Sequence, residues 1–270
     1  TLVEFAMLDR SLGNFSTAEQ RLSEAMGLAR TPQQRSNVLA GTSELKNFRG
    51  EIRGAVRAYE AGLAEEAKYQ APAIVLVGRL TLPGRLARAD AAAGARELAK
   101  LHKELRTPWD IYLPVADMQY YVEVEDVIRA EQAVTALDAV IAKQNFKVFN
   151  AMAYFGRARV NELKGDCNAA IRYFGEALKL DPLDASSHSY IGRCYRKLGN
   201  HAAAEAELTK ALRASPASGL ANLEMGLLFK ETGDTQKARV YLNRAMQTWQ
   251  AADATFKPAR QARAALAALQ

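Results

Sequence analysis

Apolar side chains recur every three or four residues along most of the chain, which is the period of an amphipathic helix rather than the alternation of a strand. The pattern begins at once with Leu2, Val3 and Phe5, and it is present in the middle of the chain over residues 92–105 and 128–142. Much of the apolar content is Ala and Leu, which are strong helix formers. The pattern predicts an all-α chain.

Prolines divide these helices into short segments. Pro32, Pro72 and Pro108 stand where helix pairs are expected to end, since proline cannot donate a backbone hydrogen bond and restricts the residue before it. Pro83 and Pro114 fall within the expected first helices of two pairs, which they should bend or interrupt.

The C-terminal part of the chain repeats itself at an interval of 34 residues. In each copy a glycine can end one helix in the left-handed conformation, and the Asp or Asn after it can cap the next helix. Alanines let the two helices approach closely, and a larger residue four positions after the first alanine fills the groove between them. The matching columns are Gly165, Gly199 and Gly233; Asp166, Asn200 and Asp234; Ala170, Ala204 and Ala238; Phe174, Leu208 and Leu242; and Ala177, Ala211 and Ala245.

A helix–turn–helix unit with this spacing resembles the tetratricopeptide repeat. The copies are residues 151–184, 185–218 and 219–252, and the second also has Gly192 and Pro216 in family positions. The resemblance implies an α-solenoid, a right-handed superhelix of tetratricopeptide repeats and similar helix pairs with a C-terminal capping helix.

The resemblance also divides the chain into regions of one continuous solenoid. Turns at Gly13 and Gly50 predict two second helices near the start, and about seven pairs are expected in all. The expected regions are N-terminal pairs over 1–72, irregular pairs over 73–147, three clear repeats over 148–252 and a capping helix over 253–270.

Composition and charge add little that is specific. The net charge of +6 is spread over 270 residues, which is weaker than the dense basic surface of a dedicated nucleic-acid binder. No apolar stretch is long enough to span a membrane, so a cytoplasmic protein is expected, or a periplasmic one if a signal peptide preceded Thr1. Starting at Thr1 suggests a chain cut from a longer precursor, and the Ala- and Arg-rich composition suggests a bacterial source.

The sequence offers no constellation of catalytic residues. His102, His188 and His201 lie far apart without a second ligand at helical spacing, and Cys167 and Cys194 form no C-x-x-C motif. Glycine-rich phosphate loops and nucleophile elbows are absent. We therefore expect no enzyme, no cofactor and no metal site, with His188 and Cys194 as packing residues.

In tetratricopeptide repeats the first helices line a concave groove, so the resemblance implies where a partner would bind. The groove arginines suit an Asp, Glu or C-terminal carboxylate, and the aromatic rings suit an apolar side chain. The alternative is that these arginines are ordinary solvated side chains. The same register places Glu162 and Glu224 in the groove. The predicted partner-binding residues are Phe155, Arg159, Tyr190, Arg193, Arg196, Leu223, Leu227 and Lys230.

Two functions of different classes remain open at this point. The first is a scaffold that holds a peptide or protein without catalysis, and partners with acidic groups are included in this expectation. The second is the C-terminal sensor or substrate-docking region of a larger signalling enzyme or transcription regulator. A nucleic-acid partner is not expected, and self-association through the irregular region is possible.

Overall fold

The computed structural model describes residues 1–145 and 149–269, and every regular element in those two ranges is helical. The region boundary predicted between residues 147 and 148 and the last residue of the predicted cap, Gln270, lie outside the described residues. Six of the pairs are α1 (Leu2–Leu12) with α2 (Phe15–Leu28), α3 (Pro32–Phe48) with α4 (Ile52–Glu66), α8 (Leu113–Glu123) with α9 (Val127–Gln144), α10 (Asn150–Leu163) with α11 (Cys167–Leu180), α12 (Ala185–Lys197) with α13 (His201–Ala214), and α14 (Gly219–Glu231) with α15 (Thr235–Thr248).

The remaining pair has a broken first helix, as the prolines predict. It consists of α5 (Pro72–Gly78), the 3-10 turn η1 (Arg79–Thr81) and α6 (Leu82–Ala87), followed by α7 (Ala91–Glu104). Pro83 lies in the first turn of α6, where its missing N–H leaves no helical bond unmade. A second 3-10 turn, η2 (Trp109–Tyr112), precedes α8, which has Pro114 in its first turn.

The repeated turns adopt the predicted geometry. Gly165, Gly199 and Gly233 have φ of 82°, 74° and 84°, the left-handed conformation that favours glycine. The residue after each glycine caps the following helix: the Asp166 side chain, for example, accepts a hydrogen bond from the backbone N–H of Ala169 at 2.9 Å.

The core lies between the helices of each pair and between adjacent pairs. Phe174, Leu208 and Leu242, the large residues of the predicted columns, are fully buried. The final helix α16 (Lys257–Ala267) covers α14 and α15 with a face of buried alanines, as expected for a capping helix. None of the helices in the described part of the chain is both long and apolar enough to cross a membrane.

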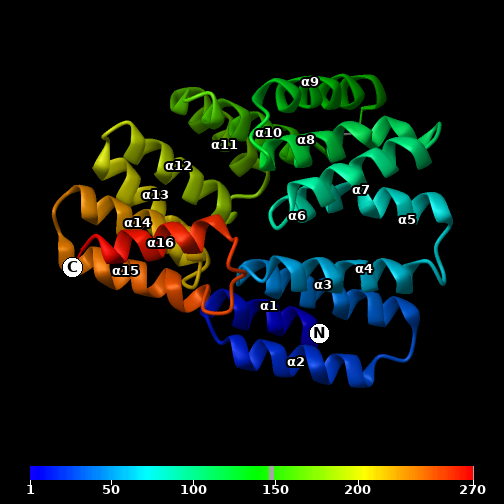
Figure 1. Cartoon of the computed structure of the whole chain (residues 1–270), viewed down its shortest axis with the longest axis horizontal. Helices are drawn as coiled ribbons and strands as arrows, with labels where there is room; N and C mark the ends of the chain where they lie inside the picture. Colours follow the sequence, from blue (N-terminus) through cyan, green and yellow to red (C-terminus); the bar gives the residue numbers. More distant parts are fainter. Residues whose placement is uncertain (146–148, 270) are drawn as a thin grey trace.

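The solenoid bends until its two ends meet, a feature that the sequence did not predict. In Figure 1 the pairs follow one another around a curve, and the last elements return to the first. The backbone N–H of Ala217 donates to the Ser11 carbonyl at 3.0 Å, and the N–H of Asp253 donates to the Gly50 carbonyl at 2.9 Å. The chain is therefore a ring closed by contacts between its first two pairs and its last pair.

Candidate functional site

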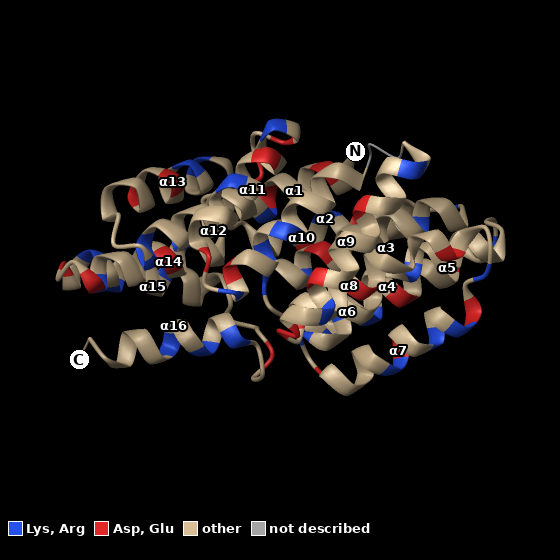
Figure 2. Ribbon diagram, turned by 90° about the horizontal axis from the view of Figure 1, so that it is seen from above, with Lys and Arg blue, Asp and Glu red and all other residues tan. Residues whose placement is uncertain are grey.

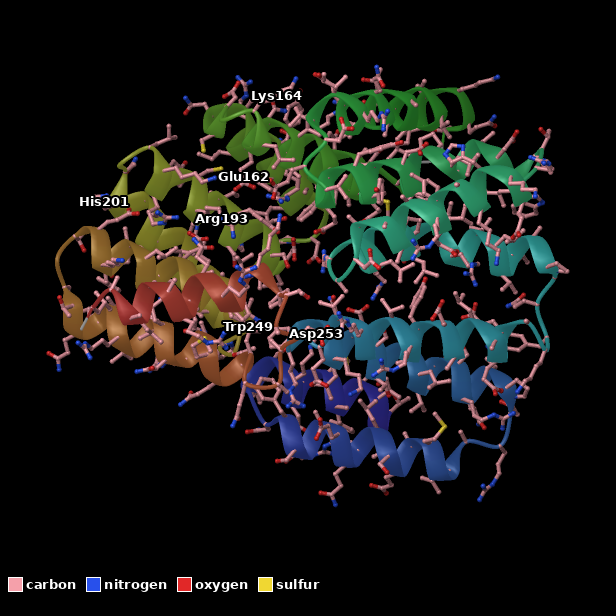
Figure 3. All side chains as sticks on the ribbon, viewed as in Figure 1. Glu162, Lys164, Arg193, His201, Trp249 and Asp253 are labelled. Atoms are coloured by element: carbon pink, nitrogen blue, oxygen red, sulfur yellow. The ribbon has the colours of Figure 1, made fainter. Side chains whose placement is uncertain are left out.

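Charged side chains from α10, α12 and α14 form one continuous network on the predicted groove positions and directly beside them. Figure 3 shows Glu162 and Arg193 nearer the middle of the molecule than Lys164 and His201. We call the network the inner ladder. Its members are Arg159, Glu162, Arg193, Arg196, Lys197, Glu224 and Glu231.

Glu224 on α14 is the strongest acceptor in the inner ladder. Its Oε1 accepts from Arg193 Nε at 2.6 Å, and its Oε2 accepts from Arg196 Nε and Nη2 at 3.0 and 2.9 Å. Arg196 also donates through Nη1 to Glu231. These bonds join α12 to α14, so the arginines hold adjacent repeats together.

Glu162 on α10 plays the matching role toward α12. It accepts from Arg159 through Oε2, and its Oε1 lies 3.1 Å from Lys197 Nζ and 3.4 Å from Arg193 Nη1. The inner ladder thus alternates cations and carboxylates across three successive repeats. Figure 2 shows acidic and basic residues mixed along many of the other helices, whereas α16 carries basic residues alone.

The carboxylates and arginines at the centre of the inner ladder are largely removed from solvent. The Glu224 side chain is 1% exposed, Glu162 4%, and the three arginines 11–18%. Burial alone would raise the pKa of Glu162, but Arg159, Arg193 and Lys197 outweigh it, so the pKa lies below its ordinary value. Burial would lower the pKa of Arg193, and Glu224 is the main reason that it is raised instead.

Tyr190 presents its ring in the middle of the inner ladder. The guanidinium carbons of Arg159 and Arg193 lie 4.5 and 5.0 Å from the ring centroid, within cation–π range. Phe174 stacks on the ring with centroids 5.3 Å apart, and Phe155 meets it edge-on at 5.6 Å. These contacts fix the ring before any partner binds.

Some arginine donors in the inner ladder remain open. Among the described residues, Arg159 Nε and Nη2 and Arg193 Nη2 make no hydrogen bond, and none of these atoms is closed off from solvent. The open donors flank the Tyr190 ring. Five predicted residues, Phe155, Arg159, Tyr190, Arg193 and Arg196, are therefore brought together, but their arginines are paired rather than freely solvated.

The prediction for Leu223 was wrong. Its side chain is fully buried against Trp249 and the α16 alanines, because the capping helix covers that side of α14. Leu227 is partly buried against the same cluster, and Lys230 is partly exposed at the end of α14.

His188 and Cys194 take the packing roles expected of them. His188 is buried with Nδ1 2.7 Å from Glu207 Oε2, and His102 Nε2 lies 2.8 Å from Asp117 Oδ1. Cys167 and Cys194 are free thiols in one core cluster, and burial raises the pKa of Cys194. The described residues contain no group of three or more His, Cys, Asp or Glu that could hold a metal ion.

The opposite side of the ring carries paired charges as well. Arg88, after α6, donates to Glu123 at 2.7 Å and to the Asn47 side chain at 3.1 Å. The pKa of Arg88 is raised, chiefly by Glu123 and to a lesser extent by Tyr190.

Comparison with known proteins agrees with the geometry of the C-terminal part. The family model of the tetratricopeptide repeat matches residues 164–219 and 196–254. The chain carries tetratricopeptide repeats. No curated protein sequence matches the chain.

Solved tetratricopeptide-repeat structures share the fold over nearly the whole chain. A tetratricopeptide repeat protein from Parabacteroides merdae is 16% identical with a TM-score of 0.56, and the match covers 97% of each chain. The APC/C hetero-tetramer Cut9–Hcn1 is 18% identical with a TM-score of 0.68, covering 94% of this chain and 46% of that chain. A monomeric IFIT1 mutant with m7Gppp-AAAA is 15% identical with a TM-score of 0.56, covering 90% and 58%.

Proposed function

We propose that this chain is a non-catalytic scaffold that binds a peptide or protein segment on the inner ladder. The observation that carries the proposal is the pair of guanidinium groups that contact the fixed Tyr190 ring, each with donors left open. Hydrogen bonds between guanidinium and carboxylate groups are among the strongest in proteins. The partner segment therefore carries an Asp, Glu or C-terminal carboxylate.

The aromatic residues supply the second element of recognition. Tyr190 and Phe155 are partly exposed and held by Phe174, so they offer flat apolar surface at little entropic cost. A segment with an apolar side chain next to its carboxylate would contact both elements at once. Lys230, which is partly exposed at the end of α14, stays a predicted contact of the partner.

Nucleic acid fits the inner ladder less well. Its cations are interleaved with Glu162, Glu224 and Glu231, which would repel a phosphate backbone. Binding to RNA with a steep loss of affinity as salt rises would contradict the protein-scaffold proposal.

The test is selection from a phage-displayed random peptide library, followed by titration of the selected peptides. Arg159→Gln is the decisive variant, since Glu162 keeps Arg193 and Lys197 as partners. Changing Arg193 or Arg196 is less informative because it would leave the buried Glu224 short of its cation. The selected peptides should share an acidic residue beside an apolar one, and Arg159→Gln should raise Kd about 10- to 100-fold through loss of a charge-assisted bond.

Arg172→Gln is the matched control, since it makes the same charge change at an exposed position of α11. It should leave Kd unchanged. Peptides without an acidic residue, or peptides that bind Arg159→Gln as tightly as the wild type, would place the partner elsewhere on the molecule.

A further inference from the structure

Besides the hydrogen bond from Ala217 to Ser11, the ring is closed by a contact between two turns far apart in the sequence. One is the α3–α4 turn at Gly50, and the other is the loop between α15 and α16. Figure 3 labels Asp253 at this junction, beside the first pairs. We call Gly50, Arg53, Asp253 and Phe256 the closing contact.

Asp253 completes a helix that lacks a cap of its own. The N-cap residue of α4, Glu51, makes no capping hydrogen bond with its side chain, unlike the caps of α11, α13 and α15. Asp253 Oδ2 instead accepts from the backbone N–H of Arg53 at 2.8 Å, across 200 residues of chain. A carboxylate at a helix N-terminus also interacts favourably with the helix dipole.

Gly50 leaves the space into which Phe256 fits. A Cβ at Gly50 would lie 2.7 Å from the Phe256 ring and 2.8 Å from the Ala252 side chain, and its φ of 75° is left-handed. Phe256 is in turn held edge-on against Trp249, with centroids 5.5 Å apart. The contact is specific in shape, but it involves only turns and loops.

We propose that the closing contact is a latch whose release opens the ring without unfolding its helix pairs. Within each pair the two helices pack along whole faces, whereas the two ends touch through a few hydrogen bonds and one aromatic ring. The latch is therefore weaker than the packing that holds each pair together. Opening separates the first pairs from the last and widens access to the inner ladder; the consequence for partner binding rests on the proposed function.

The chain supplies a matched pair of variants to test the latch. Gly50→Ala combines backbone strain with the clash against Phe256. Gly199→Ala introduces the same strain, at φ of 74° against 75°, in the same kind of turn, but its Cβ would meet nothing within 4 Å. A second pair acts on the cap: Asp253→Ala removes the acceptor for Arg53, and Asp253→Asn keeps one.

The readout is the distance between two spin labels, measured by pulsed electron paramagnetic resonance. The labels are attached to cysteines introduced by Glu24→Cys at one end of the ring and Asn243→Cys at the other. Both labelled positions are exposed, on α2 and α15, while the native thiols are buried. Gly50→Ala and Asp253→Ala should lengthen the distances between the two labels by about 10 Å or more, which is the diameter of one helix. Gly199→Ala and Asp253→Asn should keep the wild-type distribution, and circular dichroism should show unchanged helicity throughout.

Access to the inner ladder is measured without any partner by the rate at which phenylglyoxal modifies Arg159, followed by mass spectrometry. The rate should rise in the opened variants and not in their controls. If Asp253→Ala stays folded with wild-type distances and rate, the latch proposal is overturned. If the ring opens but binding of selected acidic peptides is unaffected, the latch stands and the inner ladder is not the binding surface.

Discussion

Glu224→Gln is the substitution that most directly tests how the repeats are held together. The change keeps the shape of a side chain that is 1% exposed, but it removes the negative charge that neutralises Arg193 and Arg196. Breaking a buried ion pair by removing one partner costs about 3–5 kcal/mol, because a charge is left buried without compensation. Each arginine retains a second carboxylate, Glu162 or Glu231, which places the expected loss at about 3 kcal/mol.

The assay is urea denaturation followed by circular dichroism, with Glu231→Gln as the control. Glu231 also pairs with Arg196, but the Glu231 side chain is 42% exposed, so loss of its charge should cost less than about 1 kcal/mol of stability. The large difference between two identical substitutions on one helix is the diagnostic result. Equal losses of stability would refute the view that buried charge pairing joins α12 to α14.

Three further outcomes follow from the packing and the charges. The pKa of Glu162 is lowered from 4.5 in the folded state, so its contribution to stability is full above pH 4.5 and is lost as the pH falls through the folded pKa. In Glu162→Gln the free energy of unfolding, measured against pH, should therefore fall less steeply on the acid side than in the wild type. Ala204→Leu should overpack a fully buried contact and cost about 1–3 kcal/mol in urea denaturation, while Ala206→Leu on the exposed face of α13 should change little. Cys167 and Cys194 are buried, so Ellman's reagent should react with both only as the chain unfolds; rapid reaction of the native protein would contradict the described core.

The sequence predicted the repeating parts of the fold because each is determined locally. The left-handed glycines, the Asp and Asn caps and the small residues at Ala204 and Gly192 act within one helix pair, so their spacing alone reveals them. Even the broken first helix was predictable from Pro83, since proline acts on its own backbone.

The candidate site was predicted only in part, because its character depends on contacts between repeats. The register placed Arg193 and Glu224 on adjacent first helices, and this was the signal from which their ion pair could have been predicted. Leu223 was misplaced because its exposure is decided by α16, a helix outside the repeat unit. The meeting of the two ends depends on small rotations accumulated over all the pairs, which no local pattern records.

Capping of α4 by Asp253 has a consequence for how the molecule folds and unfolds. In a linear array each repeat touches only its neighbours, so the terminal repeats lack one neighbour and fray first. Here Asp253 caps a helix 200 residues earlier in the chain, so the first and last repeats of the array contact each other. During synthesis the N-terminus of α4 stays without this cap until the last loop emerges, and a truncation that removes α16 with this loop would leave it uncapped.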